Sequence, residues 1–193
     1  MFQKKLSEGL VVEGDERVIC VDLDGTLINT DLSIDAAKKF VKKNVFNVFR
    51  LVFWYFKGIQ YLKYKVAEET EIDVSVLPYN FGFLSYLTHK KSDGCKIYLA
   101  TGATEKYANQ IADYLKIFDG IFASNQEINL IGKNKAEKLA ESFQEGGFDY
   151  AGNSVDDVPV WMKANKKILV SPSPKALKEM KSIPYTLFRD DPE

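Results

Sequence analysis

The sequence predicts an α/β fold in which a mostly parallel sheet is flanked by helices. Short apolar runs rich in β-branched residues recur along the chain, and amphipathic segments separate them. Several of these runs end in glycine and polar residues, as strands do at the ligand-binding edge of an open α/β sheet. Strands that alternate with helices favour parallel pairing with right-handed crossovers. The 193 residues suffice for one main domain with a modest insertion.

The first apolar run, Val18 to Val21, is typical of a central strand covered on both faces. Two carboxylates follow it, Asp22 and Asp24, and residues two apart lie on the same side of an extended chain. Gly25 then allows the backbone to turn sharply and to approach a ligand closely. We therefore expect both acids at the carboxyl end of a buried strand, facing one reacting group.

This pair of carboxylates suits phosphoryl transfer. Asp22 can attack a phosphorus atom and form an aspartyl-phosphate. Asp24 can protonate the leaving group and later deprotonate water. A divalent cation would be needed to bring a phosphate dianion to these negative charges. The alternative interpretation is an ordinary turn, because Asp and Gly are common turn residues.

The segment between the first two strands is far longer than an ordinary crossover. We expect residues 31–80 to form a helical insertion over the site, which leaves 1–30 and 81–193 as the core domain. Ile34, Ala37, Phe40 and Val41 follow helical spacing, and Asp31 or Ser33 can cap the start of that helix.

An aromatic run, VFNVFRLVFWYF from Val45 to Phe56, lies inside this insertion. It is too short to span a bilayer, which takes about twenty apolar residues. The interpretation we favour is a helix buried between the insertion and the main domain. A second is an interfacial helix whose flanking lysines face anionic lipid. A third is a lining for an apolar phosphomonoester. The flanking lysines are Lys38, Lys39, Lys42, Lys43, Lys57, Lys63 and Lys65.

The second strand pattern, residues 96–100, runs directly into Thr101 and Gly102. A hydroxyl and free backbone N–H groups at this point can bind phosphate oxygens, helped by a helix over residues 104–115. The same residues also suit an ordinary strand-to-helix turn.

The later motifs complete the sheet and add charge. After a strand at 119–124, either Lys133 or Lys135 can stand near a helix start and stabilise a developing negative charge. A strand at 148–151 leads into an acidic cluster at 152–157, and further strands are expected at 166–170 and 185–188. Pro174 is placed to begin the helix between these last two strands.

The motif DLDGT at residues 22–26 resembles the first signature of the haloacid dehalogenase superfamily, which consists mostly of Mg2+-dependent phosphatases and phosphotransferases. The resemblance implies a Rossmann-like core with a helical cap inserted after the first strand. It also implies that Asp22 and Asp24 are catalytic and that Thr101, Gly102 and Lys135 bind the substrate phosphate. Lys135 is preferred over Lys133 because the family places its lysine at the head of a helix.

The resemblance further implies a Mg2+ cofactor held by Asp22, Asp24, Asn153 and Asp157. The family pattern at the last strand is usually Gly-Asp-x-x-x-Asp, and Asn153 stands where the first of these acids is expected. An amide oxygen can coordinate Mg2+ but brings no negative charge. Two function classes follow. The leading one is a phosphomonoester hydrolase acting on a small or lipid-linked phosphate, and the alternative is a catalytically weak module that binds a phosphorylated ligand.

Longer segments are similar to a phosphatase-like module found ahead of some polyprenyltransferase membrane domains. The similarity covers residues from about Val18 to Ser171. It implies association with a membrane surface or with a membrane prenyltransferase through the aromatic cap. The segments that carry it are DVSVLPYN, LATGATEKYANQIADYL, FDGIFAS and GFDYAGNSVDDVPVW.

Composition narrows the remaining classes. The net charge of −1 argues against a nucleic-acid partner, and we expect a phosphorylated small molecule instead. Two cysteines, Cys20 and Cys95, cannot form a disulfide framework and favour buried thiols in a cytoplasmic protein. Residues 1–18 show no long apolar stretch, so no signal peptide is expected. The alternative location is the inner face of the membrane. His89 stands beside two lysines, so we expect its side chain at the protein surface.

Overall fold

The computed structural model describes residues 17–189, and most of the N-terminal stretch in which no signal peptide is expected lies outside the described residues. Its centre is a six-stranded sheet with the order β3-β2-β1-β4-β5-β6, and every neighbouring pair is parallel. The predicted α/β fold with a parallel sheet is therefore confirmed. The strands are β1 (Val18–Val21), β2 (Lys96–Thr104), β3 (Gly120–Ser124), β4 (Asp149–Gly152), β5 (Lys167–Val170) and β6 (Thr186–Phe188).

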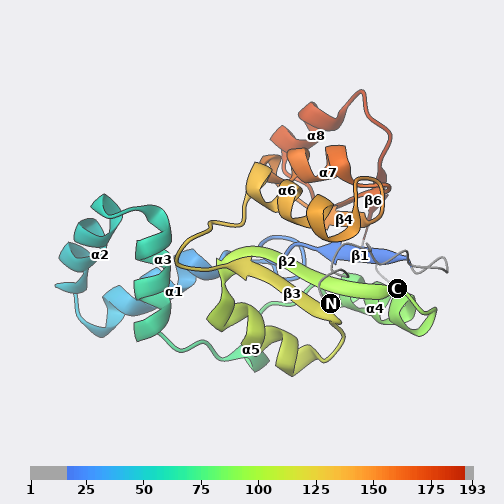
Figure 1. Cartoon of the computed structure of the whole chain (residues 1–193). Helices are drawn as coiled ribbons and strands as arrows, with labels where there is room; N and C mark the ends of the chain where they lie inside the picture. The colour runs from blue at the N-terminus through green and yellow to red at the C-terminus, as the bar shows by residue number, and fades with distance from the viewer. Residues whose placement is uncertain (1–16, 190–193) are drawn as a thin grey trace, which may run out of the picture.

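Helices cover both faces of the sheet. Figure 1 shows α4 and α5 below it and α6, α7 and α8 above it, while α1, α2 and α3 stand together at one end. The helices are α1 (Leu32–Lys43), α2 (Asn47–Phe56), α3 (Ile59–Glu69), α4 (Phe81–Ser92), α5 (Glu105–Leu115), α6 (Gly132–Phe143), α7 (Val158–Lys163) and α8 (Pro174–Met180), with single 3-10 turns at Val74–Val76 and Val155–Asp157.

The alternation of side chains along β1 divides the core in two. Ile19 and Val21 join an apolar cluster on one face, where Phe83 of α4 and Ile111 of α5 also lie. Cys20 points to the other face and joins the cluster of Leu139, Trp161 and Leu169. Because β1 is buried on both faces, its apolar run is continuous rather than alternating.

The insertion packs directly against this core. The Asp31 carboxylate caps α1 by accepting a hydrogen bond from the Ile34 amide at 3.0 Å. Phe40 of α1 and Trp54 of α2 stack at 5.3 Å between ring centroids, and both belong to the same apolar cluster as Val21. The division into a core (1–30 and 81–193) and a cap (31–80) stays a prediction, because one continuous cluster joins the two parts.

The aromatic run is not a buried helix, so the interpretation favoured from the sequence is wrong. Only Asn47 and Trp54 of α2 are buried, while Phe49, Phe53 and Phe56 expose 69%, 58% and 82% of their surface. A helix of 3.6 residues per turn presents side chains all round, and a helix at the end of a molecule can bury only one side. No described element covers the outer side of α2 (Figure 1).

Other sequence expectations hold. Cys20 and Cys95 are buried free thiols, and His89 is exposed. Over residues 17–189, no helix is both long enough and apolar enough to cross a membrane.

Candidate active site

The two carboxylates predicted to be catalytic stand at the carboxyl end of β1. The Asp22 amide donates to the Ala151 carbonyl of β4 at 2.9 Å, which holds this residue in line with the central strands. Asp22 is buried and Asp24 half-buried, and the Asp24 Oδ1 accepts a hydrogen bond from the Leu32 amide at 2.9 Å. The start of α1 therefore orients one oxygen of Asp24.

Gly25 brings two distant loops together. Its φ of 76° is a left-handed conformation that favours glycine, and its N–H donates to the Ile28 carbonyl at 2.8 Å. A Cβ atom at this position would lie 2.1 Å from Nδ2 of Asn153. The absence of a side chain at Gly25 therefore allows Asn153 to pack beside the carboxylate pair.

The structure places Lys135, and not Lys133, beside Asp22. Lys135 lies in the first turn of α6 and is 3% exposed, whereas Lys133 faces outward. Its Nζ donates to Asp22 Oδ1 at 2.7 Å and to the Tyr150 hydroxyl at 2.8 Å. This geometry favours Lys135 over Lys133, and a catalytic role for Lys135 stays a prediction.

Asp157 is buried and makes hydrogen bonds with several residues of the site. Its Oδ1 accepts a hydrogen bond from the Tyr150 hydroxyl at 2.6 Å and lies 3.5 Å from Lys135 Nζ. Its Oδ2 accepts from the amides of Asn153 and Ser154 at 3.0 and 2.9 Å. Both oxygens are thus engaged in holding Lys135 and the loop after β4, and a direct metal contact for Asp157 stays a prediction.

Thr101 and Gly102 lie within β2, which extends four residues beyond the predicted strand. Thr101 is fully buried, and its Oγ1 accepts a hydrogen bond from the Ala103 amide at 2.9 Å. The Gly102 carbonyl accepts hydrogen bonds from Lys63 Nζ at 3.1 Å and from Ser124 Oγ at 3.0 Å. Gly102 lines the site cavity and Thr101 does not, so contact between Thr101 and a phosphate stays a prediction.

A polar cavity of about 460 Å³ opens over these residues. It joins the end of β1, the start of α6 and the loop after β4 to Lys63 on α3. Its lining residues are Asp22, Asp24, Gly25, Asn29, Thr30, Asp31, Ser33, Lys63, Gly102, Ile131, Lys135, Asn153, Ser154, Asp156 and Asp157. No residue from 45 to 56 lines it, which contradicts the idea that the aromatic run faces the substrate.

Sequence reasoning missed two residues of this site. In the sequence, Lys63 is one of several lysines beside the aromatic run. No local sequence pattern indicates that α3 directs this side chain toward Gly102. Tyr150 counted only as part of an apolar strand. A tyrosine in a buried strand needs a partner for its hydroxyl, so that signal was available.

Excess negative charge dominates the electrostatics. Burial raises the pKa of Asp22 above its usual value, Lys135 opposes this rise, and the charge of Asp157 adds to it. Burial also raises the pKa of Asp24, to about 6. Burial alone would lower the pKa of Lys135, but the charges of Asp22 and Asp157 raise it above its usual value. Three carboxylates share this one buried ammonium, and a further cation would relieve their repulsion.

The residues present fit a divalent cation. Asn153 Oδ1 is buried and has no hydrogen-bond partner among the described residues, and it lines the same cavity as Asp22 and Asp24. Carboxylate and amide oxygens are the ligands that Mg2+ prefers. Between residues 17 and 189 there is no cluster of three His, Cys, Asp or Glu side chains suited to a metal.

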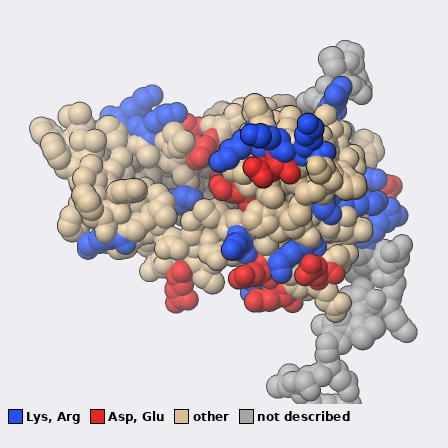
Figure 2. Space-filling model, turned by 90° about the horizontal axis from the view of Figure 1, so that it is seen from above, with Lys and Arg blue, Asp and Glu red and all other residues tan. Residues whose placement is uncertain are grey.

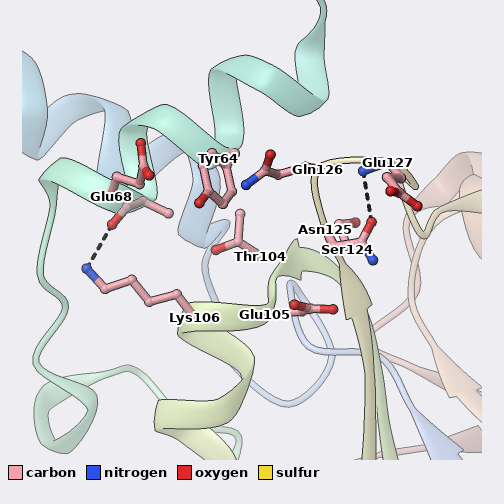
Figure 3. Close-up of a pocket in the computed structure, with 10 residues that line it drawn as sticks. Tyr64, Glu68, Thr104, Glu105, Lys106, Ser124, Asn125, Gln126 and Glu127 are labelled. Carbon is pink, nitrogen blue, oxygen red and sulfur yellow. Dashed lines mark hydrogen bonds between the residues drawn. The ribbon is translucent and has the colours of Figure 1, made fainter.

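A second cavity, of about 530 Å³, lies between α3 and the ends of β2 and β3 (Figure 3). Tyr64 and Glu68 line it from α3, and Thr104, whose Oγ1 is buried without a hydrogen-bond partner among the described residues, lines it from β2. Lys106 at its edge donates to the carbonyls of Ala67 and Thr70 at 2.8 and 3.1 Å. This cavity shares no lining residue with the site around Asp22.

Comparison with known proteins gives one relative in sequence and many in structure. No family model matches the chain. Uncharacterized protein y4nM of Sinorhizobium fredii (strain NBRC 101917 / NGR234) is 35% identical over an alignment of 161 residues that covers 79% of this chain and 29% of that protein. The chain therefore spans less than a third of the length of this relative.

Solved structures match along most of the chain. A HAD family hydrolase from Salmonella enterica subsp. enterica serovar Typhi superposes with a TM-score of 0.66 at 13% identity, over 90% of this chain and 67% of that one. Phosphoserine phosphatase, solved as a phospho-aspartyl intermediate analogue, superposes with a TM-score of 0.59 at 19% identity, over 85% of this chain and 90% of that one. The chain therefore has the fold of the haloacid dehalogenase (HAD) family hydrolases.

Proposed function

We propose that this protein is a Mg2+-dependent phosphomonoester hydrolase that works through an aspartyl-phosphate on Asp22. The observation that carries the proposal is the contact of 2.7 Å between the Asp22 carboxylate and the buried Lys135 ammonium, at the floor of a polar cavity that Asp24 also lines. The phosphoserine phosphatase with the same fold, solved as a phospho-aspartyl intermediate analogue, supports this chemistry.

In the first half-reaction, an Asp22 carboxylate oxygen attacks the phosphorus atom of the monoester. The bond between phosphorus and the ester oxygen breaks, and Asp24 gives a proton to the departing alcohol. Lys135 holds Asp22 in place and stabilises the negative charge on the phosphoryl oxygens.

In the second half-reaction, Asp24 takes a proton from a water molecule, whose oxygen attacks the same phosphorus atom. The bond between phosphorus and Asp22 breaks, which releases inorganic phosphate and restores the carboxylate. Tyr150 and Asp157 keep Lys135 directed at Asp22 through both steps.

Asp22, Asp24 and Asn153 would hold the Mg2+ ion. When bound, the ion neutralises charge between the carboxylates and the phosphate and orients the phosphoryl group. Asp157 has both oxygens engaged in hydrogen bonds, so we assign it to the support of the loop that carries Asn153.

The substrate that the cavity favours is a small, polar phosphomonoester. Apart from two glycines and Ile131, its lining residues are polar or charged, and Lys63 adds a cation from α3. Lys63 forms no ion pair among the described residues, so it is available to a phosphate or to an anionic group of the substrate. The two buried free thiols support a reducing compartment such as the cytoplasm.

The test is hydrolysis of an aryl phosphate with Mg2+, with EDTA, and by Asp22→Asn, in proteins shown by circular dichroism to be folded. We expect turnover with Mg2+, none with EDTA, and a loss of at least about a thousandfold for Asp22→Asn, because the nucleophile is removed. Asp113→Asn, which changes an acid of α5 outside the cavity, is the matched control and should keep full activity.

Asn153 supports a second candidate, a catalytically weak module that binds a phosphorylated ligand. If wild-type protein shows no turnover yet binds Mg2+ and a phosphate mimic such as vanadate, this second function replaces the first. If Asp22→Asn keeps wild-type turnover, the aspartyl-phosphate mechanism is refuted.

A further inference from the structure

The outer side of α2 carries a large apolar surface that no described element covers. We define the cap-tip face as Val45, Phe46, Val48, Phe49, Val52, Phe53, Tyr55, Phe56 and Ile59, each of which exposes at least 42% of its surface. Monomeric proteins rarely leave so many neighbouring large apolar side chains in water, so such a face marks an interaction site.

The rest of α2 is firmly anchored, which makes this exposure a property of the fold. Trp54 stacks on Phe40, and Asn47 Nδ2 donates to the Phe40 carbonyl at 2.9 Å. Arg50 lies over the Trp54 ring at 4.7 Å and pairs with Glu69 of α3, with Nη1 2.9 Å from Oε2. One side of α2 is therefore used for packing within the chain, and the other side stays exposed.

The charge around the cap-tip face indicates the kind of partner that it fits. Residues 36–67 contain eight lysines and arginines and no acidic residue, although the whole chain has a net charge of −1. Lys42 and Lys57 flank the face, are exposed, and form no ion pair within residues 17–189. Figure 2 shows this end of the molecule as uncharged surface with basic groups at its border.

We propose that the cap-tip face docks on the surface of an anionic lipid bilayer. A short amphipathic helix with aromatic side chains on one face and lysines beside them lies in the plane of a membrane interface, where acyl chains accept the rings and anionic headgroups attract the lysines. Each lysine near such a surface strengthens binding severalfold, and each buried ring adds more. A single protein partner would need acidic groups around an apolar groove, whereas a bilayer supplies both features along the whole face.

The three-helix insertion that carries the cap-tip face also supplies Lys63 to the cavity of the proposed hydrolase. The docking surface itself does not depend on the hydrolase activity, because no residue of the cap-tip face lines the cavity.

The experiment is cosedimentation of the full chain with vesicles of neutral phosphatidylcholine and with vesicles containing about a third phosphatidylglycerol. We expect binding to the anionic vesicles that weakens with salt, and much weaker binding to the neutral ones. Phe49→Ser/Phe53→Ser and, separately, Lys42→Gln/Lys57→Gln should each lower the affinity by about tenfold or more.

Matched controls test whether vesicle binding requires the cap-tip face or only an exposed aromatic ring or lysine anywhere on the protein. Phe81→Ser removes a ring that is 72% exposed at the start of α4, and Lys181→Gln removes an exposed lysine after α8. Both should bind vesicles as the wild type does. Hydrolysis of an aryl phosphate without vesicles should be unchanged in all four variants. A failure of the membrane-docking proposal can therefore be told apart from a failure of the proposed hydrolase function.

Three results would overturn the proposal. These are no binding of wild-type protein to anionic vesicles, equal binding to neutral vesicles, or undiminished binding by Phe49→Ser/Phe53→Ser. A wild-type dimer that ignores vesicles and dissociates in that variant would assign the cap-tip face to a second copy of the chain.

Discussion

Asn153 is the one uncharged ligand of the proposed metal site. Its Oδ1 is buried and has no hydrogen-bond partner within residues 17–189, and the side chain packs on the α-carbon side of Gly25. An aspartate has almost the same shape, so Asn153→Asp adds a charge at this position without requiring new space.

Asn153→Asp should therefore act in opposite directions with and without metal. In EDTA we expect a lower melting temperature, because a further carboxylate joins Asp22 and Asp24. With Mg2+ we expect a higher melting temperature and a metal affinity raised by about tenfold, since hard cations favour carboxylates. Differential scanning fluorimetry over a Mg2+ series measures both. An unchanged response to Mg2+ would show that position 153 does not face the ion.

The Tyr150 hydroxyl joins Lys135 to Asp157, and in the proposed mechanism it keeps Lys135 in position. Tyr150→Phe deletes the hydroxyl that joins them and should cost about 1–2 kcal/mol of stability. We expect kcat to fall by about tenfold while KM changes little, because Lys135 is held less firmly against Asp22. Tyr114→Phe on α5, with a half-exposed ring, is the control. A stability loss with unchanged kcat would reduce Tyr150 to a packing role.

At the scale of elements, α3 connects the insertion to the site through a single side chain. Lys63→Met keeps most of the packing of this side chain but removes its charge and its hydrogen bond to Gly102. We expect KM for a small phosphomonoester to rise by about tenfold with a smaller change in kcat, because the cation contributes mainly to binding. Lys65→Met, on the same helix but outside the site cavity, should leave KM unchanged.

Most elements could be predicted because their signals are local. The apolar run of β1 and the Asp31 cap of α1 lie within a few residues of the structure they form. The helix α7 was not predicted, since it has only six residues, although Pro159 stands in its first turn, where proline is favoured. The exposure of α2 was predicted wrongly because burial depends on what packs against a helix, and a run such as Phe49 to Phe56 does not encode that.

The candidate site shows the same limit. Asp22, Asp24 and Lys135 were found from motifs, and the structure brings them to one cavity. Lys63 escaped because its place depends on how α3 crosses the end of β2, 39 residues away from Gly102. Contacts of this kind depend on tertiary packing and leave no local pattern.

At the scale of the whole molecule, the insertion and the core should unfold together. One apolar cluster runs from Trp54 of α2 to the sheet, whereas Trp161 lies in the cluster on the opposite face. The chain has two tryptophans, so Trp54→Phe and Trp161→Phe each leave one fluorescent reporter. In each variant, tryptophan fluorescence and far-ultraviolet circular dichroism should report the same melting temperature.

A fluorescence transition of Trp54 below the circular dichroism transition of the same variant would show that the insertion melts as a separate unit. That result would favour the predicted division at residues 31 and 80. Comparison within each variant removes the effect of the substitution on overall stability.

The ion pair at the centre of the site has a consequence for synthesis. Asp22 and Lys135 are 113 residues apart, and β4, which flanks β1 on one side, comes later still. While the chain is being made on the ribosome, β1 and β2 can pair long before β4 emerges. A nascent chain stopped before Asp149 would carry both acids and Lys135 but lack Tyr150, Asn153 and Asp157. Hydrolysis by the proposed enzyme would thus appear only after β4 and the loop that follows it have emerged and β4 has paired with β1.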